Sequence, residues 1–503
     1  MSRPTPARPT GTPPAPLSIE LLVGVAEGAG GRSEVQAVLG AGERAHGVFH
    51  LDIRGPEMTR LTARVHSRQA ADDEVMRLGS LMFDALFQGA IGAAYREARG
   101  RARGSGTALR VVLTSATPAI DALPWEFLYD SSLGHFLALT PDVRLTRNLP
   151  SLSAPHPVPG RLPLRVLVAA AGPATYAGSQ LSGIDVAAER ALIEATLAPL
   201  VAEGHLQVTH ISLTQPRVLL DKVRRIQPHI FHYIGHAGIV DGTPLLFCGP
   251  PGGEAVPLSG TQIAATLGLA GELQLVLLNT CWGGQAGITG SLFGLAPAIA
   301  AAGVPAVVGW QTGISDRSAP PLAGRLYEEL ARGASVDEAL TIARLALYAD
   351  PKVERLAWGL AVAYLRTELT RIVTPQPKTW QLLVIDDEQI RADLLRSRLT
   401  RRGLEVTWAN GGEAGLERAR QMHPDVIVLD LKMPGMDGFQ VLHALKSGSA
   451  TANIPVVVLS SLGADYETAL RAYTGGAQYV IPYNGRLDQL EQVLRGNLNV
   501  PLD

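Results

Sequence analysis

Two stretches decide the fold of this chain: FHYIGHAGIVDG at residues 231–242 and LQLVLLNTCWGGQAG at residues 273–287. Each contains a short apolar run that ends in glycine and other turn residues. Such runs are typical of the buried strands of a parallel sheet. Ligands of parallel sheets bind beyond the carboxyl ends of the strands. The pattern therefore predicts that His236 and Cys281 lie in one crevice, each at the exit of one of two adjacent strands.

A cysteine and a histidine in one crevice can act as a nucleophile and its base. A thiol attacks a carbonyl as the thiolate, and a nearby imidazole lets the thiol ionise near neutral pH. Backbone N–H groups in the turns at Gly238 and at Cys281 are candidates for holding the developing oxyanion. The alternative is structural: free cysteine is among the most buried residue types, and His236 would then be a hydrogen-bonded core histidine.

Five motifs, in this order along the chain, resemble the CHAT domain, a caspase-like cysteine-peptidase family: LPWEFLYD (123–130), HYIGHAG (232–238), LLNTCWGG (277–284), WQTGISD (310–316) and WGLAVAYLR (358–366). The resemblance covers about residues 17–366. It implies a caspase-like three-layer α/β domain, a His236–Cys281 catalytic dyad and a protein substrate. The family has glycine directly after the histidine, whereas this chain has Ala237 and then Gly238. Alanine supplies an N–H but cannot take glycine-only backbone angles.

Asp316 follows the expected strand at residues 306–309. Loops after the strands of one parallel sheet face the same crevice, so Asp316 is a candidate wall of the substrate pocket. An aspartate there could favour a basic residue at the cleaved position through a charge-assisted pair. An alternative with equal support is that Asp316 caps the N-terminus of the helix that follows.

Composition restricts the class of protein. A chain of 503 residues is too long for one core and should hold two or three domains. The formal net charge of −2 argues against a nucleic-acid partner. The only cysteines are Cys248 and Cys281, which argues against a disulfide framework and a zinc site and suits a reducing interior. Cys248 is expected to be structural.

No membrane segment or secretory signal is expected. Residues 1–16 are rich in proline and threonine and should form a disordered tail without a signal peptide. Residues 292–310 carry no charge, but Pro297 and Pro305 interrupt them, so a buried helix and strand are expected there instead of a membrane span. The cytoplasm is the expected location.

The resemblance implies an N-terminal part of the CHAT domain at residues 17–150 and its caspase-like catalytic part at residues 161–367. Composition predicts a polar linker with two prolines at residues 368–379, followed by a C-terminal domain at residues 380–499. In the first part, strands are expected at 18–25 and 47–53 with turns between them, and one long helix at 72–103. Trp125 is expected to anchor the core and Glu126 to be the buried partner of a basic residue. From residue 164 onward strands and helices alternate, as a parallel α/β sheet requires, and a closing strand is expected at 358–365.

The C-terminal segment brings carboxylates to strand exits. LLVIDDE (382–388) and VIVLDLKMPGMDG (426–438) each place aspartates directly after an apolar run. Three carboxylates, those of Asp386, Asp387 and Asp430, converge only if a cation neutralises them, and oxygen ligands suit Mg²⁺. The alternative is that these carboxylates cap the helices that follow.

These motifs, together with IPVVVLSS (454–461), resemble a response-regulator receiver domain. The resemblance implies a flavodoxin-like (βα)5 fold and a phosphoryl group transferred from a sensor histidine kinase to Asp430. Magnesium would be held by Asp386, Asp387, Asp430 and the backbone carbonyl of Lys432. Ser460 stands where the family's hydroxyl residue contacts the phosphoryl oxygen.

One family residue is missing: Ile481 precedes Pro482 where the family has lysine. Its loss removes a cation that pairs with the phosphoryl group. The receiver is therefore expected either to accept phosphate with a weak switch or to be a degenerate docking domain. The leading hypothesis is a caspase-like cysteine endopeptidase regulated by a phosphoacceptor receiver domain. The alternative is a non-catalytic signalling scaffold with the same two folds.

Overall fold

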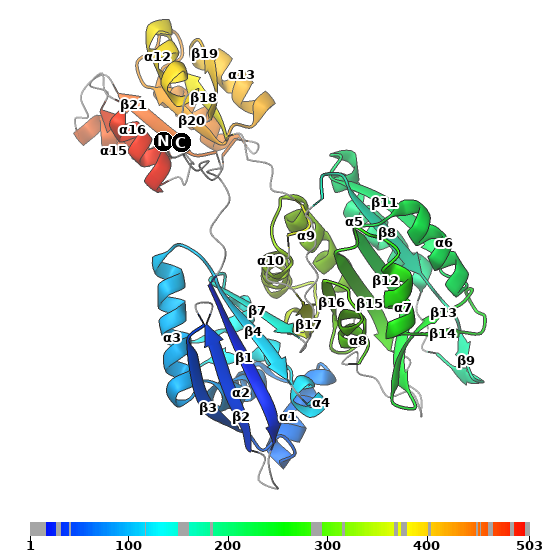
Figure 1. The fold of residues 1–503 in the computed structure, drawn as a ribbon. Coiled ribbons are helices and arrows are strands. Elements are labelled where there is room, and N and C mark those ends of the chain that lie inside the picture. Colours follow the sequence, from blue (N-terminus) through cyan, green and yellow to red (C-terminus); the bar gives the residue numbers. More distant parts are fainter. Residues whose placement is uncertain are drawn as a thin grey trace, which may run out of the picture. The chain divides into compact units, whose positions relative to one another are not determined.

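The computed structural model of this chain describes residues 17–26, 32–39, 42–115, 117–148, 160–181, 185–282, 294–313, 317–366, 371–373, 380–400, 404–448, 451–452, 454–460, 466–482 and 487–497. These residues belong to two compact units, with the division between residues 376 and 377 (Figure 1). The disordered tail predicted at residues 1–16 lies outside the described residues. No helix in the described part of the chain is long and apolar enough to cross a membrane.

The larger unit is built on one thirteen-stranded sheet. Its parallel centre, in spatial order, consists of β11 (Leu206–Ser212), β8 (Leu164–Ala170), β12 (Ile230–Val240), β15 (Leu275–Trp282) and β16 (Ala306–Trp310). The sheet continues through β17 (Ala361–Leu365), β7 (Val143–Asn148), β4 (Leu109–Ser115), β1 (Leu17–Ala26), β2 (Arg32–Leu39) and β3 (Arg44–His50). Beside β12 lie β13 (Thr243–Cys248) and β14 (Val256–Ser259).

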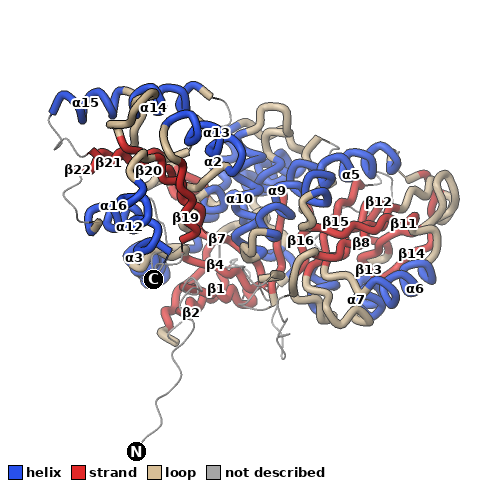
Figure 2. Tube along the Cα trace, turned by 90° about the horizontal axis from the view of Figure 1, so that it is seen from above, coloured by secondary structure: helices blue, strands red, loops and turns tan. Residues whose placement is uncertain are grey.

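Helices cover both faces of the central strands. On one face lie α5 (Val186–Ala202), α9 (Ala319–Ala331) and α10 (Val336–Ala349), and on the other α6 (Pro216–Ile226), α7 (Gly260–Leu267) and α8 (Leu295–Ala301). Figure 2 shows α5 and α9 on one side of these strands and α6 and α7 on the other. Alternate residues of β12 enter two separate cores: Ile230 and Ile234 one, Phe231 and Tyr233 the other. Since successive side chains of a strand point to opposite faces, this division confirms the predicted three-layer α/β fold.

The remaining helices and short elements lie around these strands. These are α1 (Pro56–His66), α2 (Asp72–Leu86), α3 (Gly89–Gly104), α4 (Pro118–Asp121), α11 (Ala357–Leu360), the 3₁₀ turns Trp125–Phe127 and Leu137–Leu139, and the short strands β5 (Tyr129–Asp130), β6 (His135–Phe136), β9 (Thr175–Tyr176) and β10 (Ser179–Gln180).

Three sequence predictions in the larger unit are wrong in detail. The single helix predicted at residues 72–103 is two helices, α2 and α3, because Gly89 takes a φ of +54° that interrupts the helical backbone. The segment predicted as turns between the first strands contains β2, which pairs with both β1 and β3. The closing strand predicted at residues 358–365 begins as helix α11 and becomes β17 at Ala361.

The linker predicted at residues 368–379 is not a free connection throughout, because its middle packs on the larger unit. Ile372 and Val373, within residues 368–379, are buried in the core of the larger unit. Arg371 and Val373 also form isolated β-bridges with Ser335 and Gly160. Apolar side chains within this polar stretch therefore tie its middle to the larger unit.

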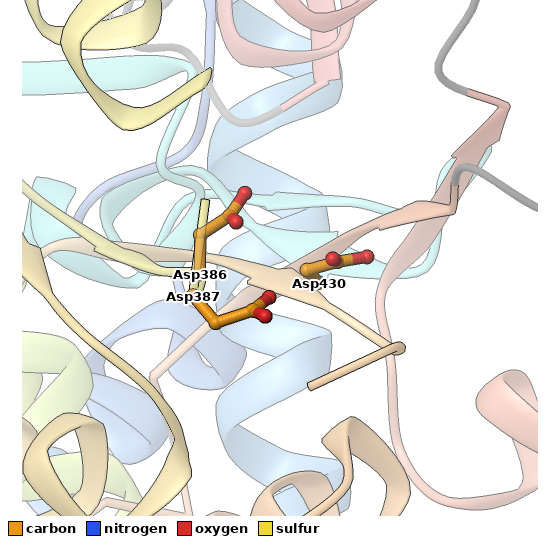
Figure 3. Close-up of side chains that lie close together, drawn as sticks. All are labelled: Asp386, Asp387 and Asp430. Atoms are coloured by element: carbon orange, nitrogen blue, oxygen red, sulfur yellow. The ribbon is translucent and has the colours of Figure 1, made fainter. Parts of the chain in front are cut away.

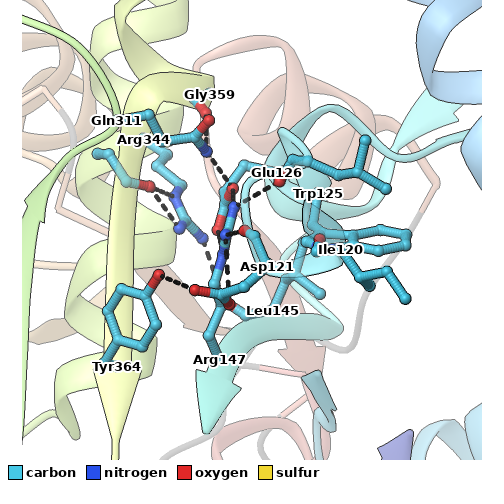
Figure 4. A network of polar contacts seen from close by, with 12 residues as sticks. Ile120, Asp121, Trp125, Glu126, Leu145, Arg147, Gln311, Arg344, Gly359 and Tyr364 are labelled. Atoms are coloured by element: carbon cyan, nitrogen blue, oxygen red, sulfur yellow. Dashed lines mark hydrogen bonds and ion pairs between the residues drawn. The ribbon is translucent and has the colours of Figure 1, made fainter. Parts of the chain in front are cut away.

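A buried polar network links the two halves of the large sheet (Figure 4). Trp125 and Glu126 are buried as predicted, and the basic partner of Glu126 is Arg147 of β7. Arg147 Nη2 lies 2.6 Å from Glu126 Oε2, and neither side chain is exposed. Gln311, directly after β16, donates to the same carboxylate. Burial alone would lower the pKa of Arg147, but the charge and hydrogen bonds of Glu126, together with Tyr364 and Asp121, raise it.

Replacing Glu126 by Ala is expected to lower the free energy of unfolding of the larger unit by about 3–5 kcal/mol, because it leaves Arg147 buried without its carboxylate. The double variant Glu126→Leu/Arg147→Met should be markedly more stable than the single variant, because neither charge of the pair is then left buried without its partner. The measurement is urea unfolding of the full chain. Glu97→Ala is the control: Glu97 pairs with Arg101 at 2.6 Å on the surface, and its loss should change stability little.

The smaller unit is a five-stranded parallel sheet with the strand order β19–β18–β20–β21–β22. The strands are β18 (Trp380–Ile385), β19 (Leu404–Ala409), β20 (Val426–Asp430), β21 (Val456–Ser460) and β22 (Tyr479–Pro482). The helices are α12 (Gln389–Thr400), α13 (Gly412–Met422), α14 (Gly438–Ser447), α15 (Tyr466–Thr474) and α16 (Asp488–Asn497). This 2-1-3-4-5 order confirms the predicted flavodoxin-like (βα)5 fold.

Candidate functional site

The first candidate site lies on two neighbouring central strands of the larger unit. Strands β12 and β15 pair in parallel, and their register places His236 opposite Cys281. Adjacent strands lie about 4.8 Å apart. The fold therefore brings together two backbone positions that are far apart in the sequence, while the side chain of Cys281 lies outside the described residues.

The turn predicted at residues 235–238 is wrong. Strand β12 continues to Val240, because β13 folds back on it and extends the ladder. Gly238 is therefore a strand residue opposite Leu245, and Cys281 lies within β15. Ala237 is likewise paired on both sides, with Trp282 and with Leu246. A strand position does not require glycine-only angles, so alanine after the histidine is compatible with this backbone.

Tyr233 holds the backbone around His236. Its hydroxyl lies 3.0 Å from the carbonyl oxygen of His236 and 2.6 Å from that of Phe247. A Cβ at Gly235 would lie only 2.3 Å from the same hydroxyl, so the absence of a side chain at Gly235 permits this approach. The His236 side chain is almost fully buried, at 2% exposed.

A second histidine, His232, and the second cysteine, Cys248, have structural roles. His232 is buried with its Nδ1 3.1 Å from the hydroxyl of Tyr327, and burial lowers its pKa to about 3. It is therefore neutral at pH 7. Cys248 is buried with Sγ 3.2 Å from the carbonyl oxygen of Val256, and burial raises the pKa of its thiol to about 11. A protonated, buried thiol is inert, in agreement with the structural role expected for Cys248.

The strand end beside His236 and Cys281 carries polar residues that the sequence did not single out. Asn279 lies two residues before Cys281 on β15, and Trp310 Nε1 donates to its Oδ1 at 3.2 Å. Both side chains are buried. Trp310 is the first residue of the motif WQTGISD, and this motif was the sequence feature that could have pointed to the contact. Asp316, the candidate wall of the pocket, lies outside the described residues.

The second candidate site lies at the strand ends of the smaller unit (Figure 3). Asp386 and Asp387 follow β18, and Asp430 ends the neighbouring parallel strand β20. One oxygen of each carboxylate lies within 4.8 Å of the others. Asp386 and Asp430 are buried, whereas Asp387 is exposed. Burial raises the pKa of Asp430, and the Asp386 charge adds to this effect, while Arg391 opposes it.

This donor set fits a hard divalent cation. Magnesium prefers carboxylate, carbonyl and water oxygens, which these three aspartates and the following loop can supply. Asp430 Oδ1 is buried and no side chain among the described residues donates to it, so it could accept a ligand. Lys432, whose carbonyl is predicted to contribute, lies in the loop two residues after Asp430. The residues therefore match the magnesium site that the resemblance implies.

The helix after this loop packs closely on the end of β20. A Cβ at Gly438, the first residue of α14, would lie 2.2 Å from the carbonyl oxygen of Asp430. Asp437 caps α14, with its Oδ1 accepting from the backbone N–H of Gln440 at 2.8 Å. Glycine and aspartate at the end of MPGMDG thus set the position of α14 against Asp430.

The remaining predicted receiver residues are placed by the strand register. Ser460 ends β21 opposite Pro482 of β22, and its side chain lies outside the described residues. Asp430 is opposite Leu459, which in turn is opposite Ile481. Ile481 is buried at 5% exposed. The position at which the resemblance expects lysine therefore carries a core side chain.

Sequence reasoning missed Arg391, which lies inside the acidic site. Its Nη2 lies 2.5 Å from Asp430 Oδ2, and its Nε lies 2.5 Å from Asp386 Oδ2. Burial alone would lower the pKa of Arg391, but the hydrogen bonds to Asp386 and the neighbouring charges raise it. No local sequence signal identified it, because an arginine near the start of a helix is ordinarily exposed; in the structure the neighbouring Ile390 is 79% exposed and Arg391 only 7%.

Comparisons with known proteins match both units. Residues 77–390, more than half of the chain, match the family model of the CHAT domain, and residues 382–495 match that of the response regulator receiver domain. The transcriptional regulatory protein AfsQ1 of Streptomyces coelicolor is 38% identical over 107 residues, which is 21% of this chain and 46% of that protein. The response regulator PleD of Caulobacter vibrioides is 43% identical over 82 residues, 16% of this chain and 18% of that protein.

A third relative carries the name of an enzyme. The protein-glutamate methylesterase/protein-glutamine glutaminase 5 of Myxococcus xanthus is 43% identical over 99 residues, 19% of this chain and 28% of that protein. This chain therefore spans less than half of the length of each of these three relatives.

Proposed function

Because this chain belongs to the CHAT domain family and carries a response regulator receiver domain, we propose that it is a caspase-like cysteine endopeptidase controlled by its phosphoacceptor domain. The observation that carries the proposal is the register of β12 and β15, which places His236 opposite Cys281. The pair comes from two strands of a parallel sheet, at the end where ligands of such sheets bind.

In the proposed reaction, the Cys281 thiolate attacks the carbonyl carbon of a peptide bond in a protein substrate. His236 supports the thiolate and donates the proton with which the amine leaves, and water then releases the acyl group from the sulfur. The backbone N–H groups of Gly238 and Cys281 are candidates for holding the oxyanion. Asp316 remains the candidate that selects a basic residue at the cleaved position.

The receiver domain is proposed to accept a phosphoryl group on Asp430 from a sensor histidine kinase. When bound, Mg²⁺ would neutralise charge between the carboxylates and the incoming phosphoryl group. Asp386, Asp387, Asp430 and the carbonyl of Lys432 are the proposed ligands. The oxygens of Asp430 that the cation leaves free would provide the nucleophile, and Ser460 would contact the phosphoryl oxygen.

A non-catalytic signalling scaffold is the second candidate, and two observations favour it. His236 is only 2% exposed, so a substrate could reach its imidazole only after a rearrangement. Gly238 is held in the ladder with β13, which leaves less freedom for an oxyanion hole than a turn would. In the scaffold, the caspase-like unit would bind a partner protein without cleaving it.

Thiol labelling tests the proposed nucleophile. Iodoacetamide at pH 7.5 is expected to modify Cys281 of the native full chain and to spare Cys248, whose pKa of about 11 keeps it protonated. Peptide mass spectrometry locates the adduct, and unfolding in urea should make Cys248 reactive. Cys248→Ala is the control and should label as the wild type does. If iodoacetamide modified only Cys248 in the native chain, Cys281 would not be an activated nucleophile. The non-catalytic scaffold would then be the better description.

A further inference from the structure

Arg391 occupies the position at which the proposed magnesium site would bind its cation. The guanidinium contacts three of the four carboxylate oxygens of Asp386 and Asp430: Asp386 Oδ2 at 2.5 Å, Asp386 Oδ1 at 2.8 Å and Asp430 Oδ2 at 2.5 Å. The fourth, Asp430 Oδ1, is buried, and no side chain among the described residues donates to it. The same oxygens that a divalent cation needs are therefore bound to a resident cation.

The surrounding structure holds this arrangement in place. The backbone N–H of Glu388 donates to Asp386 Oδ1 at 2.8 Å, and Trp408 Nε1 donates to the Asp386 carbonyl oxygen at 2.8 Å. Arg391 itself lies on the inner face of α12 and is only 7% exposed. A planar guanidinium can bridge two carboxylates at once, which an ammonium group cannot do with the same geometry.

A divalent cation and this guanidinium cannot both use the site as it stands. Magnesium requires oxygens at about 2.0–2.1 Å in a nearly octahedral arrangement. Two cations among the same partly buried carboxylates also repel each other. Binding of the metal therefore requires Arg391 to withdraw from at least part of its contacts.

We propose that Arg391 is a resident counter-ion of the phosphoacceptor site and competes with the divalent cation for Asp386 and Asp430. The inference rests on the proposed phosphoacceptor role of the receiver domain and adds a residue that sets its metal affinity. In the metal-free protein, Arg391 supplies positive charge that the buried Ile481 cannot supply. The site is thereby neutralised without a metal, and it binds the metal more weakly than its three carboxylates alone would.

The test measures the affinity of the full chain for Mn²⁺, because free Mn²⁺ is counted directly by electron paramagnetic resonance. Arg391→Gln is expected to lower the dissociation constant at least about tenfold, since it removes both the competing bonds and the repulsion. Arg398→Gln is the matched control. Arg398 lies on the same helix and pairs with Glu491 at 2.5 Å and Asp488 at 2.7 Å, away from the acidic site. Its substitution should leave the affinity unchanged.

Arg391→Lys provides a second variant that retains the charge. Its ammonium cannot bridge both carboxylates, so we expect an affinity between those of the wild type and Arg391→Gln. Adding Asp430→Asn to Arg391→Gln should weaken the gained binding, which assigns the gain to this site. A thermal melt without metal reports whether each variant is folded.

The outcomes separate this inference from the proposed function. Mn²⁺ affinity in both Arg391 variants equal to or weaker than that of the wild type would overturn the competition while the metal site remains. No specific binding by any of the proteins would overturn the metal site itself, and the inference with it. Competition of added Mg²⁺ for the bound Mn²⁺ in Arg391→Gln would extend the result to the expected cation.

Discussion

Replacement of Cys281 by Ala is expected to lower the peptidase kcat/KM of the full chain by at least about a thousandfold, because no other group at that position can attack the carbonyl carbon. His236→Ala should cause a loss of similar size. The double variant should be no worse than either single variant, since the two side chains would act as one unit and their effects would not add. The measurement is the release of peptides from a fluorescently labelled, unfolded protein substrate.

Cys248→Ala is the control for this series, because Cys248 is the other cysteine of the chain and is buried away from the proposed chemistry. It should retain wild-type turnover. Full activity in Cys281→Ala would eliminate the peptidase proposal. Absence of turnover in the wild type, together with slow labelling of Cys281, would favour the scaffold.

Asp430→Asn is expected to abolish phosphorylation of the chain, because an amide cannot act as the nucleophile that a carboxylate oxygen provides. Incorporation of ³²P from labelled acetyl phosphate in the presence of Mg²⁺ measures the reaction, and chelation of the metal should stop it. The acyl phosphate formed on the wild type should be released by hydroxylamine. The expected change is from measurable incorporation to background.

Asp393→Asn is the matched control, since Asp393 is an exposed residue of α12 outside the acidic site. It should be phosphorylated as the wild type is. If Asp430→Asn were modified as fully as the wild type, the phosphoacceptor assignment would be wrong. If neither the wild type nor the control accepted phosphate, the degenerate docking domain would be the better description, as the missing lysine at Ile481 already allows.

Local patterns predicted the architecture well where strand and helix signals were strong. Apolar runs bounded by glycine located β12 and β15, and the aspartates after β18 and at the end of β20 predicted the acidic cluster correctly. The same reasoning failed where a partner strand changed the outcome. The run that ends in Gly235 predicts a turn, but pairing with β13 keeps the chain extended to Val240. The glycines at positions 235 and 238 are compatible with a turn and with an extended strand, and pairing with β13 selects the strand.

Buried charges show the same difference between what local sequence predicts and what contacts between distant segments decide. An arginine at the start of a helix is ordinarily expected in solvent, because taking a charge out of water is costly. Arg391 is buried because Asp386 and Asp430 converge on it from two different strands. Arg147 was likewise not predicted as the partner of Glu126, since the two are joined only when β7 lies beside the 3₁₀ turn at Trp125–Phe127.

By itself, the sequence determined the two folds, the main strands of each sheet and the residue types able to act as nucleophile, base and phosphoacceptor. Periodicity and motif are local properties, and short-range sterics and burial are enough to express them. Only the tertiary structure decided that His236 stands opposite Cys281 and that Arg391 lies between Asp386 and Asp430. These are contacts between segments distant in sequence, and their energies depend on the register and burial that the assembled sheet imposes.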